Sequence, residues 1–103
     1  MFRKMKAYLT INVHGVDLRE MTDICFNLKQ PTQGLEFNYT GAAINTSEAG
    51  KLIVTIPKAD ADQLALTDAS GQIMFMRTGG IPDATKPFVV PIWELQKEGG
   101  YGT

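Results

Sequence analysis

The stretches Met21–Gln30 (MTDICFNLKQ) and Gly71–Thr78 (GQIMFMRT) decide the fold. Large apolar side chains recur at every second position in both: Ile24, Phe26 and Leu28 in the first, Ile73 and Phe75 in the second. A period of two is typical of a β-strand that buries one face. The two stretches therefore predict two strands of a mostly-β domain.

Similar short runs appear on both sides of these stretches. We expect strands at Lys6–Val13, Thr22–Gln30, Leu35–Thr40, Lys51–Ile56, Gln72–Arg77 and Pro87–Ile92, with a weaker candidate at Ala42–Asn45. Regularly spaced strands separated by turn residues indicate an all-β, antiparallel β-sandwich of about six to seven short strands, immunoglobulin-like. The pattern of two cysteines and a tryptophan found in antibody domains is missing, because the chain has one cysteine.

The connections are expected to be turns, with one short helical segment. Pro57 and the acidic residues after it favour a single helical turn within Lys58–Leu66, with Ala61, Leu64 and Ala65 inward. We expect a loop at Asp17–Glu20 and turns at Pro31–Gly34 and Asp68–Gly71. The segment Gly79–Asp83 reads as an irregular connection and not as a tight hairpin. The proline residues near both ends of Pro87–Ile92 favour an edge position for the last strand.

Length and composition fit one small domain. The 103 residues are 44% hydrophobic and 20% charged, and a domain of this size buries roughly 65% of its unfolded surface. We expect a β-sandwich domain over residues 1–98, with a closing turn at Trp93–Glu98, and a flexible tail at 99–103. The net charge of −1 gives no electrostatic case for nucleic acid. No run has the length of a membrane span, and Ala7–Val13 is interrupted by Thr10 and Asn12, unlike the apolar run of a signal peptide. We therefore expect cytosolic synthesis and no membrane partner.

Candidates for chemistry are few. His14 is the only histidine and Cys25 the only cysteine, and an enzyme built on them would need the two to meet. Both are better explained as ordinary structural residues. The pair Asp60 and Asp62 resembles the start of a calcium loop, but later positions of that loop do not match. We therefore expect no enzyme activity, no metal and no cofactor.

Two other side-chain sets suggest contacts. Met74 and Met76 lie opposite the buried face of their strand, which predicts a central strand or a contact with another chain. Exposed aromatic residues would offer a sugar-stacking platform, for which Trp93 and Tyr39 are the first candidates. A carbohydrate-binding module that contacts host cell-wall glycans is therefore the alternative to a protein-binding role.

The order of segments resembles a family of small β-sandwich proteins from phages and prophages of Gram-positive bacteria. These are related to the N-terminal domain of baseplate upper proteins. The matching stretches are Asp23–Gln30, Leu52–Ile56, Lys58–Leu66, Gly71–Arg77 and Val89–Gly100. The segment Pro82–Pro87 departs from the family pattern, which leaves the pairing of the last strand open.

The resemblance implies a non-enzymatic structural or assembly module of a phage tail or baseplate. Its expected partners are other virion proteins and further copies of itself, and its expected location is the virion. A tail protein leaves the cell by lysis and needs no signal peptide. The family supplies no catalytic residues. We expect the contact surface in Arg77–Lys86 and along the last strand, with Arg77, Lys86, Phe88 and Trp93 as candidate residues.

Overall fold

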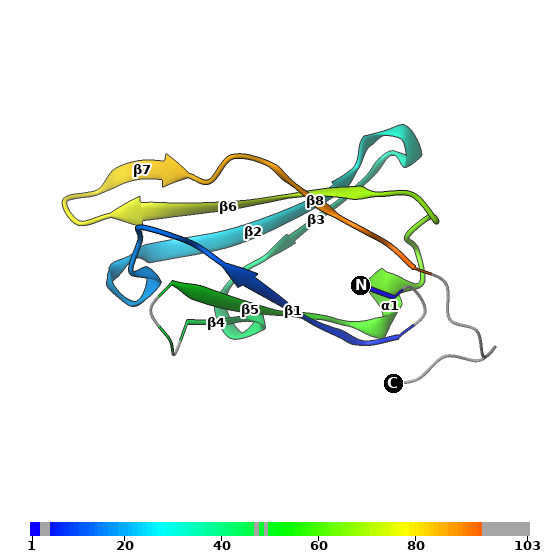
Figure 1. The fold of residues 1–103 in the computed structure, drawn as a ribbon, viewed down its shortest axis with the longest axis horizontal. Helices are drawn as coiled ribbons and strands as arrows, with labels where there is room; N and C mark the ends of the chain where they lie inside the picture. The colour runs from blue at the N-terminus through cyan, green and yellow to red at the C-terminus, as the bar shows by residue number, and fades with distance from the viewer. Residues whose placement is uncertain (3–4, 47, 49, 94–103) are drawn as a thin grey trace.

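The chain folds into two antiparallel sheets that pack face to face (Figure 1). A computed structural model describes residues 1–2, 5–46, 48 and 50–93. The three-stranded sheet has the order β1 (Ala7–Asn12), β5 (Lys51–Ile56), β4 (Ile44–Asn45). The larger sheet contains β3 (Leu35–Tyr39), β2 (Thr22–Gln30), β6 (Ala69–Arg77), β7 (Ile81–Ala84) and β8 (Phe88–Val90). The predicted antiparallel β-sandwich is confirmed.

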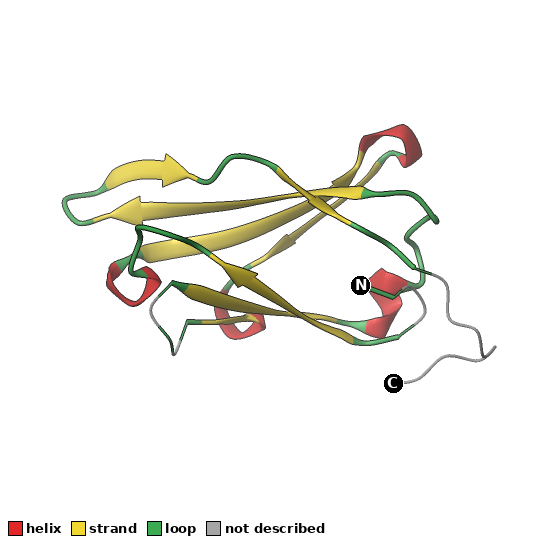
Figure 2. Cartoon of the chain, viewed as in Figure 1, coloured by secondary structure: helices red, strands yellow, loops and turns green. Residues whose placement is uncertain are grey.

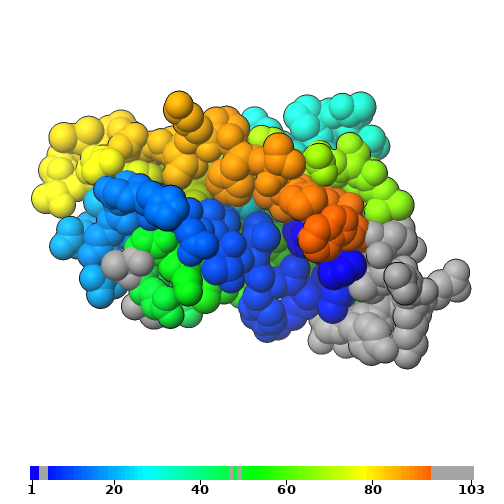
Figure 3. Space-filling model, viewed as in Figure 1, coloured from blue at the N-terminus to red at the C-terminus, as the bar shows by residue number. Residues whose placement is uncertain are grey.

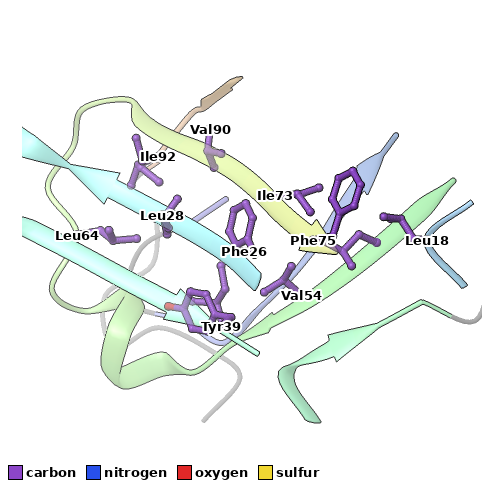
Figure 4. Close-up of a cluster of buried hydrophobic side chains, with 13 residues drawn as sticks. Leu18, Phe26, Leu28, Tyr39, Val54, Leu64, Ile73, Phe75, Val90 and Ile92 are labelled. Carbon is purple, nitrogen blue, oxygen red and sulfur yellow. The ribbon is translucent and has the colours of Figure 1, made fainter. Parts of the chain in front are cut away.

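The core lies between the sheets, where strands of both sheets contribute alternate residues (Figure 4). From β2 and β6 come the fully buried Phe26, Leu28 and Ile73. Leu52, Val54 and Ile56 of β5 face them and are also fully buried. The period of two seen in the sequence therefore marks the two inner faces.

The strand β1 is an edge strand with one covered face. Leu9, Ile11 and Val13 are half-buried on its inner side, whereas Tyr8, Thr10 and Asn12 are exposed. All six residues pair with β5 in unbroken register, from Ala7 opposite Ile56 to Asn12 opposite Lys51. The predicted strand and its inward residues are confirmed.

The strand β6 is the central strand of the larger sheet, as the apolar residues on both its faces predicted. It pairs with β2 on one side and with both β7 and β8 on the other. It begins at Ala69, so the predicted turn at Asp68–Gly71 is wrong beyond its first residue. Ala69 is buried and pairs with Val90, and Gly71 pairs with Phe88. The first three residues of β6, Ala69–Gly71, have small or no side chains and show no apolar alternation in the sequence. They belong to the strand because they pair with β8.

The prediction of an irregular connection at Gly79–Asp83 is wrong. A three-residue loop turns the chain after Arg77, and β7 then pairs with β6 in a hairpin. Gly79 and Gly80 have φ values of 88° and 76°, which glycine adopts without steric cost. All four residues of β7 are exposed, so burial imposes no alternation on this strand.

Short helical turns close the remaining connections (Figure 2). The helix α1 (Lys58–Ala61) is shorter than the predicted Lys58–Leu66 segment, although Ala61 and Leu64 are buried as expected. Further 3₁₀ turns occupy Leu18–Glu20, Pro31–Gln33 and Gly41–Ala43. The first replaces the predicted loop and places the fully buried Leu18 in the core.

Within the described ranges, no helix is long and apolar enough to cross a membrane. The predicted tail at 99–103 and all of the closing turn after Trp93 lie outside the described residues.

Candidate functional site

A groove runs along one side of the sandwich, between β1 and the β7–β8 edge. Figure 3 shows these segments, blue and orange, on the face towards the viewer. The part of the groove beside β7 encloses about 540 Å³ between the end of β1 and the segment from Asp83 to Phe88. A second part of about 530 Å³ continues between β1 and β8 and shares Ile11 and Phe88 with the first. We call both parts together the lateral groove.

The base of the lateral groove is apolar. Ile11, Val13 and Phe75 line it, together with Phe88. The Phe88 ring stacks on Phe26 of the core, with ring centroids 6.1 Å apart. The base of the groove is therefore formed by side chains that also pack in the hydrophobic core.

The end of the lateral groove near the β6–β7 hairpin is charged. The Arg77 Nε lies 2.6 Å from Asp83 Oδ2, and the guanidinium lies over the Phe75 ring. The hydrogen bond from Arg77 holds the pKa of Asp83 below its ordinary value, as does the backbone N–H of Ala84. Lys86 is exposed and forms no ion pair with a described residue. This end therefore presents Arg77, whose charge is paired with Asp83, and Lys86, which has no ion-pair partner in the described part of the chain.

Thr85 joins β7 to β8 across the break in the sheet edge. Its backbone N–H donates to Ile73 O at 2.9 Å, and its Oγ1 accepts from Ile73 N at 3.1 Å. Its carbonyl accepts from Gln72 Nε2 at 2.9 Å. The segment that departs from the family pattern is therefore hydrogen-bonded to β6, and the last strand pairs with β6.

The structure brings together three of the four residues predicted for the contact surface. Arg77, Lys86 and Phe88 line the same part of the lateral groove. Asp83, within the predicted range Arg77–Lys86, also lines it, and so does His14, which was missed. The opposite charges of Arg77 and Asp83, flanking a glycine-containing loop, were a readable signal for a hairpin. No comparable signal in the sequence pointed to His14.

Trp93 lies elsewhere and does not line the lateral groove. Its ring meets Phe2 edge-on, with centroids 5.3 Å apart, and Phe2 and Trp93 form an isolated parallel bridge. The backbone N–H of Trp93 donates to Met1 O at 2.9 Å, and the Met1 amino group donates to Pro91 O at 2.6 Å. Because the Trp93 side chain is 53% exposed, it forms a separate aromatic surface with Phe2.

Tyr39 is not available as a sugar platform, so that part of the carbohydrate prediction is wrong. Tyr39 is the last residue of β3, its side chain packs in the core, and the residue is 6% exposed. Its hydroxyl donates to Asp60 Oδ2 at 2.9 Å. Burial, and then this contact with Asp60, raise the pKa of Tyr39 above its ordinary value. The contact joins β3 to α1 and has a structural role.

The two residues considered for catalysis, His14 and Cys25, lie in different parts of the sandwich. His14 lines the lateral groove, whereas Cys25 lies on the outer face of the larger sheet, with its Sγ 3.8 Å from Asn38 Oδ1. The structure does not bring the two together. No group of three or more metal-ligating side chains occurs in the part of the chain that the structure describes.

Scans against family models, curated proteins and solved structures found no match to this chain.

Proposed function

We propose that this chain is a non-enzymatic assembly module of a phage or prophage tail or baseplate and works through protein–protein contacts. The observation that carries the proposal is the lateral groove, an apolar opening between two strand edges that carries Arg77, Lys86 and Phe88 together. Free strand edges accept partner strands through main-chain hydrogen bonds, and apolar pockets beside them accept partner side chains. This geometry suits binding and assembly.

The phage context comes from the sequence. Most of the segments that resemble the baseplate-related family are strands or turns of this sandwich: they fall in β2, β5, α1 and β6. The proposed location is the virion, and the proposed partners are other virion proteins and further copies of the chain.

The test is mass spectrometry of purified particles released after prophage induction of the source bacterium. The proposal expects this chain in tails or baseplates at a fixed stoichiometry. Lys86→Glu should reduce its incorporation, because the reversal changes the charge of an exposed groove side chain that has no ion-pair partner among the described residues. Lys29→Gln, which removes a cation from the outer face of the larger sheet without placing like charges opposite each other at Glu36, is the control and should be incorporated normally. Particles that form without the chain would reject the proposal.

A carbohydrate-binding role is the second candidate, and the exposed Phe2–Trp93 pair favours it. Aromatic faces that remain open to solvent can stack on sugar rings. Trp93 is the only tryptophan, so its fluorescence reports on this surface alone. Quenching by purified cell-wall polysaccharide, lost in Phe2→Ser, would support this role. Unchanged fluorescence across a glycan panel would reject it.

A further inference from the structure

The free edge of β1 presents regular, unused backbone groups. Val13 N donates to Gly50 O at 2.7 Å, one residue beyond the pair of Asn12 with Lys51. In an antiparallel ladder, hydrogen-bonded and non-hydrogen-bonded pairs alternate. The N–H and C=O groups of Tyr8, Thr10 and Asn12 therefore point away from β5. They face the side of the lateral groove, where no described strand pairs with β1.

Among the described edge strands, β1 alone lacks a feature that discourages pairing. Charged residues, prolines and short length are the usual protections of a sheet edge. β3 carries Glu36, β7 contains Pro82, and β4 has two residues. β8 has three residues and lies between prolines. The six residues of β1 (AYLTIN) contain no charge and no proline.

We propose that β1 pairs with β1 of a second copy, antiparallel about a two-fold axis at Thr10. This register makes hydrogen-bonded pairs of the residues whose backbone groups are free. Thr10 then faces Thr10 of the second copy, and Tyr8 faces its Asn12. On the inner side, Leu9 faces Ile11 of the second copy. The three-stranded sheets join into one six-stranded sheet.

The second copy is the favoured occupant because its charge and polarity match. The paired stretch carries no charge in either chain, so no like charges oppose each other and no charged side chain loses its water. Polar residues meet polar residues on the outer face, and apolar residues meet apolar residues on the inner face. Lys6 and His14 flank the paired stretch and lie outside it. The incoming strand also lies alongside the opening between Ile11 and Phe88.

This inference deepens the proposed function, on which it rests for the use of the groove side in assembly. It is tested by site-specific cross-linking of the full chain in a Cys25→Ser background. Hydrogen-bonded antiparallel pairs have Cα atoms about 5.5 Å apart, within the range of a disulfide. Thr10→Cys should therefore oxidise to a covalent dimer about 100-fold faster than an unpaired position, because pairing raises the effective concentration of thiols.

Two matched variants show whether the register is correct. Thr55→Cys places the thiol on the same sheet face but on the central strand, and Tyr8→Cys places it on β1 away from the axis. Both should form little covalent dimer. Thr10→Lys should weaken dimerisation of the otherwise unchanged chain about five-fold, because it opposes like charges, whereas Thr55→Lys should not.

Equal oxidation rates at positions 10 and 55 would overturn the inference, as would a wild-type chain that sediments as a monomer at every concentration. Either result leaves particle incorporation untouched, so the proposed function is judged separately. Conversely, a dimer in solution with no chain in particles would support the inference and reject the phage role.

Discussion

Gln30 and Ala65 are joined by a reciprocal pair of hydrogen bonds across 35 residues of sequence. Gln30 Nε2 donates to Ala65 O at 3.0 Å, and Ala65 N donates to Gln30 Oε1 at 2.9 Å. The same side-chain amide donates to Thr67 O at 2.8 Å. The Gln30 side chain therefore satisfies three backbone groups of the irregular segment between α1 and β6. It is 1% exposed, so water cannot replace it.

Gln30→Leu should lower the free energy of unfolding by about 2 kcal/mol, because it leaves backbone groups without partners in a buried site. Urea unfolding at neutral pH measures this loss. Gln63→Leu is the control, since Gln63 is exposed and should change stability by less than about 0.5 kcal/mol. Equal effects of the two substitutions would show that the hydrogen bonds of Gln30 contribute nothing specific.

Thr85→Val should expose the role of the hydroxyl that joins β7 to β8. The substitution keeps the branched shape but removes the acceptor for the Ile73 N–H, at a cost of about 1 kcal/mol. Hydrogen exchange of the Ile73 amide should accelerate by more than the loss of global stability alone would produce. Thr78→Val in the exposed hairpin loop provides the comparison, and it should leave exchange at Ile73 as in the wild type. An unchanged Ile73 amide in Thr85→Val would contradict the prediction.

Gly71→Ala should strain the base of the lateral groove. An added Cβ would lie 2.8 Å from Phe88 Cε2 and 3.0 Å from Phe26 Cε1. Such overpacking costs roughly 1–3 kcal/mol, measurable by urea unfolding. In a Phe88→Leu background the same substitution should cost less, because the nearest ring atoms are gone. A cost that is the same in both backgrounds would place the strain elsewhere.

Stability should fall at alkaline pH through Tyr39. Its pKa is raised in the folded state, so the folded chain keeps the phenol protonated where the unfolded chain ionises it. The contribution is complete below the unfolded pKa of about 10 and is lost as pH rises towards the folded value. The free energy of unfolding should be measured at about pH 8 and at about pH 11. Its decrease between the two should be smaller for Tyr39→Phe than for the wild type.

Tyr8→Phe is the matched control for this pH dependence. Tyr8 is 64% exposed, so removing its hydroxyl should leave the alkaline loss at the wild-type size. A Tyr39→Phe chain that loses as much stability as the wild type would assign the pH dependence to other groups.

The elements that the sequence predicted are those with one buried face. β1, β2, β3, β5 and most of β6 show apolar alternation, because the sandwich buries every second side chain. β7 was not predicted, because neither of its faces is buried and its sequence shows no alternation. It is a strand through its pairing with β6. The start of β6 was missed because its small residues face Phe88 and Val90, which lie far away in sequence.

The candidate site could likewise be predicted only where the local sequence carried a signal. Arg77 and Lys86 bound the segment predicted as a contact surface, and both line one groove with Phe88. Placing Trp93 in the same surface failed, because its position depends on contacts with Met1 and Phe2 at the start of the chain. Contacts between distant segments leave no local pattern, so His14 was likewise not assigned to the groove.

The contact between Met1 and Trp93 holds the two ends of the described chain next to each other. Residues 1 and 93 lie side by side, while the β6–β7 hairpin projects from the opposite end (Figure 1). A polypeptide joined at both positions would enter and leave at nearly the same place. The domain would then form a side branch on that polypeptide, and tension along it would act first on the hydrogen bonds that join Met1 to Pro91 and Trp93, before either sheet or the hairpin end.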